Sequence, residues 1–208
     1  MKKLSIIMCA IMMCIAAFSP IRSEAQWIKP MYFNVDWQFN APVGNDYADV
    51  ASGWGMSFET GYYVIPHLAV GVYFSYHTNH RYVGEQVLQL SNTSSLYTDQ
   101  QHSIFQMPFG ALLKYRIVKG KHWEPYLTMK VGAMYAQMNS YTQVVKFYDN
   151  SWGFNMQPEA GVTFYPMPHK RCGIHLAIYY NFSSNKNKTL TYDIDCYNNI
   201  GFHLGVAF

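Results

Sequence analysis

The sequence contains few charged residues, few cysteines and a single long apolar run. Charged residues make up 13% of its 208 residues, and the formal net charge is +3. Such a small positive excess gives no reason to expect a nucleic-acid partner. The mean hydropathy is −0.10, and no second long apolar run follows the first one. A membrane-spanning helix is therefore not expected after the N-terminal segment.

The motifs that commonly carry chemistry are also missing. The sequence has no glycine-rich phosphate loop, no Cys-x-x-Cys pair and no paired-carboxylate motif. We therefore expect no cofactor, no bound metal and no catalytic residue.

One polar segment offers a weak exception to this expectation. His77, His80 and His102 lie near Asp99 and Ser103, and a serine hydrolase or a metal site uses such residues. Neighbouring residues of a strand point to opposite faces. His102 and Ser103 are therefore a poor pair of base and nucleophile if both lie in a strand.

The N-terminus has the pattern of a secretory signal peptide. Lys2 and Lys3 precede a short apolar run over residues 4–18, and Ser23 and Ala25 supply small residues at a cleavage site. The apolar run is shorter than the roughly 20 residues that a spanning helix needs. We predict a signal peptide over residues 1–25 and one mature domain over residues 26–208.

Aromatic residues are abundant, with 18 tyrosines, 13 phenylalanines and 5 tryptophans. Segments of alternating bulky and small residues recur along the chain, which predicts β-strands. The connections alternate between long polar segments, such as residues 79–101, and short turns that carry proline or glycine. We predict about eight strands, over residues 27–39, 52–64, 68–77, 102–117, 123–138, 152–165, 172–182 and 200–208.

The two faces of these strands favour a membrane barrel over a soluble barrel or a secreted β-sandwich. The bulky face is too large for the interior of an eight-stranded barrel, which side chains just fill, so it is expected to face lipid. The small face also carries isolated charges, which are tolerable inside only when they are paired. We predict a polar network in the lumen that comprises Asp36, Glu59, Lys114, Arg116, Lys130, Glu159, His175 and His203.

Aromatic residues near the strand ends resemble the belts that mark membrane interfaces. The predicted belt comprises Trp27, Tyr62, Tyr63, Trp123, Trp152, Tyr165, Tyr179 and Tyr180. The same topology places Cys172 and Cys196 at opposite ends of neighbouring strands. A disulfide needs Cα atoms within about 7 Å, so we predict that no bond joins these two cysteines.

The terminal stretch "IGFHLGVAF", the strand "PYLTMKVGA" and the signal peptide resemble the small outer-membrane β-barrel proteins of the OmpA/OmpX-like group. The resemblance implies an all-β, eight-stranded, antiparallel, up-and-down transmembrane barrel in the cell outer membrane, with outer-membrane lipid as its surroundings. It also implies that the barrel-assembly machinery reads the last strand, through Phe202, Leu204, Val206 and Phe208.

These observations favour a non-enzymatic barrel with a structural or surface-interaction role, in which the long outer loops contact a surface ligand. Two alternatives remain open at this stage. One is a narrow porin-like channel or small-molecule conduit, and the other is a lipid A-modifying enzyme of the outer membrane.

Overall fold

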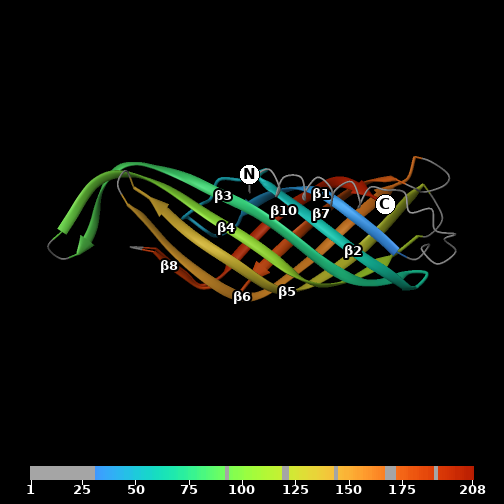
Figure 1. Cartoon of the computed structure of the whole chain (residues 1–208). Coiled ribbons are helices and arrows are strands. Elements are labelled where there is room, and N and C mark those ends of the chain that lie inside the picture. The colour runs from blue at the N-terminus through green and yellow to red at the C-terminus, as the bar shows by residue number, and fades with distance from the viewer. Residues whose placement is uncertain (1–30, 92–93, 119–121, 143–144, 167–171, 190–191) are drawn as a thin grey trace, which may run out of the picture. The chain divides into compact units, whose positions relative to one another are not determined.

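The computed structural model describes residues 31–91, 94–118, 122–142, 145–166, 172–189 and 192–208. The predicted signal peptide and Trp27 lie outside these described residues. Eight strands form a closed barrel (Figure 1). They are β1 (Met31–Pro42), β2 (Gly55–Ile65), β3 (Leu68–Ser91), β4 (Ser94–Arg116), β5 (Trp123–Tyr141), β6 (Lys146–Phe164), β7 (Gly173–Ser183) and β10 (Tyr197–Ala207).

Every strand of the barrel pairs antiparallel with its neighbours in the order β1-β10-β7-β6-β5-β4-β3-β2. The ring closes between the first and last strands, where Phe33 and Phe208 exchange two backbone hydrogen bonds of 3.1 and 2.8 Å. Closure matters because it leaves no open strand edge in the lipid. The described residues contain no helix that is long and apolar enough to cross a membrane. The predicted up-and-down barrel is confirmed.

The strand faces are distributed as the alternation predicts. On β7, Ile174, Leu176 and Ile178 are exposed on the outside, whereas His175 and Ala177 are buried inside. The same distribution holds around the ring: large apolar side chains lie outside, and small or polar side chains lie inside. This is the distribution of a barrel whose solvent is lipid.

The predicted irregular loop at residues 79–101 is wrong. β3 and β4 continue through it as one long hairpin, with pairs such as Arg81↔His102 and Val87↔Tyr97. β5 and β6 are also extended, up to the pair Tyr141↔Lys146. The polar composition of these segments suggested loops, but threonine and tyrosine form strands readily once a neighbouring strand supplies hydrogen bonds.

The last outer connection contains a small hairpin of its own. β8 (Asn187–Thr189) pairs with β9 (Tyr192–Ile194). The final barrel strand begins at Tyr197 rather than at residue 200. The sequence prediction missed the hairpin because its strands have only three residues each.

Three members of the predicted aromatic belt do not face lipid. Tyr63 and Tyr165 line an interior cavity, and Tyr179 is buried inside the barrel. In contrast, Tyr62, Trp123, Trp152 and Tyr180 are exposed on the outer surface. Strand parity decides the difference, because adjacent residues such as Tyr62 and Tyr63 must point to opposite faces.

The prediction for the cysteines is confirmed. Cys172 and Cys196 are both free and exposed. Cys172 precedes β7 and Cys196 precedes β10, and these strands pair from Ala207↔Gly173 to Tyr197↔Ser183. The two thiols therefore lie about one strand length apart, roughly 30 Å at about 3.3 Å per residue.

Candidate functional site

The middle of the lumen contains a buried ion network centred on Lys130. The Lys130 ammonium on β5 lies 2.6 Å from Glu159 Oε2 on β6, and it also pairs with Glu59 Oε1 on β2. β2 and β6 lie opposite each other in the ring. All three side chains have 0% exposure, so this ammonium links opposite walls of the barrel across the lumen.

A second chain of contacts runs through His175. Its Nδ1 lies 2.6 Å from Asp36 Oδ1, and its Nε2 contacts the hydroxyl of Tyr126. That hydroxyl donates to Glu159 Oε1 at 2.8 Å. His203 Nδ1 contacts the other oxygen of Glu159 at 2.9 Å. His175 connects Asp36 to the Lys130 cluster, and His203 contacts Glu159 of that cluster. Both histidines can do so because β7 and β10 are neighbouring strands.

Lys114 and Arg116 lie nearer the end of the barrel where β4 finishes. Lys114 is 3.9 Å from Glu59 Oε2 and lies over the rings of Tyr32 and Tyr126, 4.5 and 3.9 Å from their centroids. Arg116 pairs instead with Glu124, at 2.8 Å. Arg116 therefore lies outside the central network, although the sequence predicted that it belongs to it.

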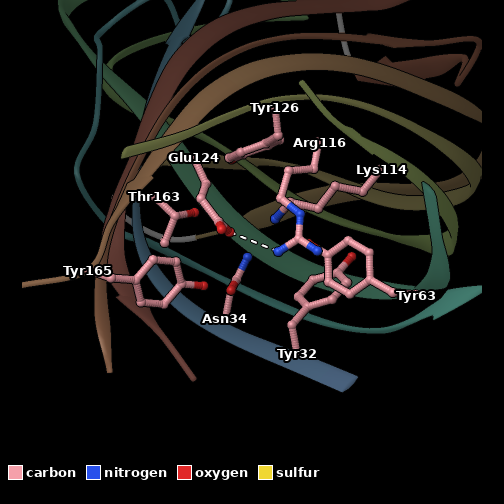
Figure 2. Close-up of a pocket in the computed structure, with 9 residues that line it drawn as sticks. All are labelled: Tyr32, Asn34, Tyr63, Lys114, Arg116, Glu124, Tyr126, Thr163 and Tyr165. Atoms are coloured by element: carbon pink, nitrogen blue, oxygen red, sulfur yellow. Dashed lines mark hydrogen bonds and ion pairs between the residues drawn. The ribbon is translucent and has the colours of Figure 1, made fainter. Parts of the chain in front are cut away.

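Arg116 and Glu124 belong to a small interior cavity, with the ring of Tyr63 beside the guanidinium (Figure 2). Its lining residues come from five strands and the residue after β6: Tyr32, Asn34, Tyr63, Lys114, Arg116, Glu124, Tyr126, Thr163 and Tyr165. The cavity volume is about 10 Å³, which is room for about one water molecule. A cavity of this size does not accommodate an organic ligand.

Neutral side chains bridge the lumen on the other side of the ion network. Asn199 on β10 donates to Gln106 on β4, across the ring, at 2.9 Å. The Tyr73 hydroxyl on β3 donates to Asn155 on β6 at 2.9 Å. Buried polar groups are stable only when such partners are supplied, so the interior is a packed polar core.

The network contains one more carboxylate than ammonium groups. Asp36, Glu59 and Glu159 supply three carboxylates, whereas Lys114 and Lys130 supply two ammonium groups. Asp36 contacts His175 and Glu159 contacts His203, so each of these two carboxylates also has an imidazole partner.

Asp36, Glu59 and His203 place ligand-type atoms within 4.8 Å of one another. However, each of the three already has a charged or titratable partner, namely His175, Lys130 and Glu159. The Lys130 ammonium would also repel a cation bound at Glu59. We therefore interpret this trio as part of the ion network rather than as a metal site.

The outer mouth of the barrel is covered by the first outer loop, residues 43–54. The Tyr47 ring stacks on His102, with centroids 4.0 Å apart, and His102 Nδ1 contacts the Tyr47 carbonyl at 3.0 Å. Arg81 donates to the Asp46 carbonyl at 2.6 Å. Burial raises the pKa of Tyr47 to about 12 and lowers the pKa of His102.

The inner wall becomes apolar where this loop packs. Ile104, Met134 and Met138 form one buried cluster with Tyr47 and Tyr197. The loop is therefore held by hydrophobic contact as well as by the Tyr47–His102 stack.

The weak candidates for hydrolytic or metal chemistry are not assembled. His102 points inward and is buried, whereas Ser103 lies on the opposite face of β4. Both ring nitrogens of His102 are engaged, one by Tyr47 and the other by Gln100 Oε1 at 3.0 Å. His77 is buried and His80 is exposed, so these two histidines cannot share a metal ion.

The predicted polar network left out two interior residues, Glu124 and Tyr126. Glu124 lies next to Trp123 at the start of β5, and both Glu124 and Tyr126 have the inward parity of Lys130. The alternation along this strand was therefore the sequence signal that could have placed both residues in the lumen. The predicted assembly residues Phe202, Leu204, Val206 and Phe208 all lie on the outward face of the last strand or directly after it.

The closed barrel, its apolar outer band and its charged, packed lumen define an integral outer-membrane β-barrel. The model of the family described as "Outer membrane protein beta-barrel domain" matches residues 5–208. The chain belongs to this family and is an outer-membrane protein.

Solved barrels show similar chain paths at low sequence identity. Neisserial surface protein A is 13% identical with a TM-score of 0.49, covering 85% of this chain and 95% of its own. The attachment invasion locus protein Ail of Yersinia pestis is 14% identical with a TM-score of 0.42, covering 86% and 97%. The N-terminal barrel of Pseudomonas aeruginosa OprF is 8% identical with a TM-score of 0.37, covering 85% and 97%. No curated protein sequence matches the chain.

Proposed function

We propose that this protein is a non-enzymatic outer-membrane barrel that presents a partner-binding surface outside the membrane. The observation that carries this proposal is the length of four adjacent strands. β3, β4, β5 and β6 have 24, 23, 19 and 19 residues, whereas β1, β2, β7 and β10 have 12, 11, 11 and 11. A membrane-crossing strand needs about 9–11 residues, so four strands continue well beyond the bilayer.

We call this continuation of β3 to β6 the outer extension. Long outer segments and short periplasmic turns are typical of outer-membrane barrels, and loops or extensions on a rigid scaffold are where binding surfaces concentrate. The inner face of the outer extension is covered by the first outer loop. On its outer face, Tyr82, Tyr97, Tyr141 and Tyr148 are exposed.

The packed lumen supports this role over that of a channel. Lys130 bridges Glu59 and Glu159 across the barrel with fully buried side chains. Moving these charges aside to admit a solute would break a buried ion network, which is costly. In planar bilayers we expect no steady conductance steps from the purified barrel, and reproducible steps would overturn this part of the proposal.

The proposal is tested by shortening the hairpin. Replacing residues 84–99 with an Asn-Gly turn joins Val83 to Gln100, which pair across β3 and β4, by a favourable two-residue hairpin connection. We expect the shortened protein to insert and fold, but to lose binding to surface ligands on an array of purified glycans and proteins. Gly84→Ala is the matched control, since a methyl group there contacts nothing within 4 Å. Identical binding by the full and shortened proteins would contradict the proposal.

We also propose that the barrel-assembly machinery recognises the outward row of the last strand. Leu204, Val206 and Phe208 are exposed on the face that lipid covers after insertion. Before closure this row is available to an assembly protein. Phe208→Ser is expected to slow insertion into membranes that contain the machinery, while spontaneous refolding into detergent keeps its rate. Equal slowing in both would indicate a stability effect alone.

A further inference from the structure

We propose that the outward face of the outer extension binds the saccharide part of glycolipids in the outer leaflet. Four exposed tyrosines define this surface, which we call the tyrosine face. Tyr82 and Tyr97 lie on the β3–β4 hairpin, and Tyr141 and Tyr148 lie on the β5–β6 hairpin.

The tyrosine face continues the lipid-facing surface of the barrel. On β5, Val131, Tyr135 and Tyr141 have the same parity and therefore share one face. Along this face the side chains change from aliphatic to glutamine, asparagine and tyrosine. Because the lower part of the face contacts hydrocarbon, its upper part contacts whatever the same lipids present above their acyl chains.

The height of the tyrosine face identifies which lipid group this is. Tyr135 pairs with Trp152, an exposed ring of the kind that marks the membrane interface. Tyr141 lies six residues beyond Tyr135 on β5, about 20 Å along the strand. A strand tilt of about 40° reduces this to a height of about 15 Å. A phospholipid headgroup layer is only about 5–8 Å thick. Tyr141 therefore lies above phospholipid headgroups, at a level that only a larger, glycosylated headgroup reaches.

The chemistry of the tyrosine face suits sugars. The hydroxyl of Tyr97 donates to Glu85 at 3.1 Å, and that of Tyr82 donates to Asp99 at 3.3 Å. Ring faces with a negative quadrupole attract the C–H faces of sugar rings, and carboxylates accept hydrogen bonds from sugar hydroxyls.

The charge of the surface also bears on the ligand. Lys146 lies over the rings of Tyr141 and Tyr148, 5.2 and 5.5 Å from their centroids. Glu85 and Asp99 place negative charge on the β3–β4 part of the face, which disfavours phosphate groups there. The neutral sugars of the headgroup are therefore the better match.

This inference goes beyond the proposed function, because its ligand belongs to the membrane itself and not to an external partner. Loss of partner binding on shortening the hairpin tests the proposed function. Tyr141 and Tyr148 remain in that shortened protein, so sugar binding at β5–β6 is measured separately.

The test uses the full-length mature protein in phospholipid nanodiscs, titrated with soluble core oligosaccharide released from lipopolysaccharide. We expect saturable chemical-shift changes at residues 139–148 in the wild type. The double variant Tyr141→Ser, Tyr148→Ser is expected to bind about tenfold more weakly. The control Tyr62→Ser, Tyr115→Ser removes two exposed rings of the same outward surface at the opposite end of the strands and is expected to bind normally.

A further pair of measurements separates ring stacking from misfolding and from phosphate binding. Tyr141→Phe, Tyr148→Phe keeps both rings and is expected to retain most of the affinity. Phosphocholine is expected not to compete. The proposal is overturned if the wild type shows no shifts at residues 139–148, if the serine variant binds as well as the wild type, or if phosphocholine competes fully.

Discussion

His175 on β7 places its Nδ1 2.6 Å from Oδ1 of Asp36 on β1, across the intervening strand β10. This contact begins the chain that continues through Tyr126 to Glu159. It joins segments that are 139 residues apart in the sequence. Such lumen contacts connect strands that do not share backbone hydrogen bonds. They therefore stabilise the closed ring in addition to the backbone hydrogen bonds between neighbouring strands.

The first prediction concerns this histidine. His175→Ala leaves the carboxylate of Asp36 buried without its partner, and an unpaired buried acceptor of this kind costs about 3 kcal/mol. The free energy of unfolding is measured by urea titration in lipid vesicles. His80→Ala is the control because His80 is exposed, and a His175→Ala barrel no less stable than this control would contradict the role of His175.

The second prediction concerns Lys130. Lys130→Met leaves Glu59 and Glu159 buried without their shared ammonium, and breaking a buried pair in this way typically costs about 3–5 kcal/mol. Urea unfolding in lipid vesicles measures the free energy of unfolding. Lys188→Met is the control, since its ion pair with Asp193 is largely exposed and is worth about 1 kcal/mol at most. Equal effects of the two substitutions would contradict the role of Lys130.

The third prediction concerns the close approach of β4 and β5. Gly110 and Gly132 are paired across these strands, and a Cβ at Gly132 would lie 2.0 Å from the Phe109 carbonyl oxygen. Gly132→Val is therefore expected to destabilise the barrel by about 3 kcal/mol or more, seen as loss of the heat-modifiable folded band on gels. Gly84→Ala should leave that band unchanged, and a stable Gly132→Val barrel would mean that the strands separate easily.

The fourth prediction concerns orientation in the membrane. Cys196 precedes the last strand on the side of the long outer segments, whereas Cys172 precedes β7 on the opposite side. A membrane-impermeant maleimide added to intact cells is expected to label the Cys172→Ser variant, which retains Cys196. It should not label Cys196→Ser until the outer membrane is permeabilised. The reverse pattern would invert the topology.

The fifth prediction concerns pH and the first outer loop. Burial holds the pKa of His102 below its usual value, near 6.5, so His102 binds a proton less readily when the loop is docked than when it is released. Docking is therefore fully stable above about pH 6.5 and weakens as the pH falls below that value. Arg81, which also disfavours the charged imidazole, faces the same site.

Hydrogen exchange of residues 43–54, corrected for intrinsic rates, is expected to increase between pH 8 and pH 5 in the wild type. His102→Phe keeps an aromatic ring for Tyr47 but cannot be protonated, so its exchange should not depend on pH in this way. A wild-type loop that is equally protected at both pH values would rule out His102 as the cause.

Much of the barrel was predictable because a strand in a membrane has a strict period of two. The alternation in residues 173–183 already places His175 in the lumen, and the alternation in residues 123–138 places Lys130 there. It does not indicate which inward residues meet. Arg116 was predicted to join the central network, yet it pairs with Glu124, because the stagger of the strands determines the height of each side chain.

Local periodicity was enough to predict the number of barrel strands, the inward or outward direction of most strand residues and the separation of the two cysteines. Other features depend on how the strands come together in the closed ring. β3 to β6 continue through polar segments because each strand satisfies the backbone hydrogen-bonding groups of its neighbour. The polar side chains alone do not indicate this pairing. The tertiary structure also decided the partners of Lys130 and the docking of Tyr47 on His102, because both depend on how the ring closes.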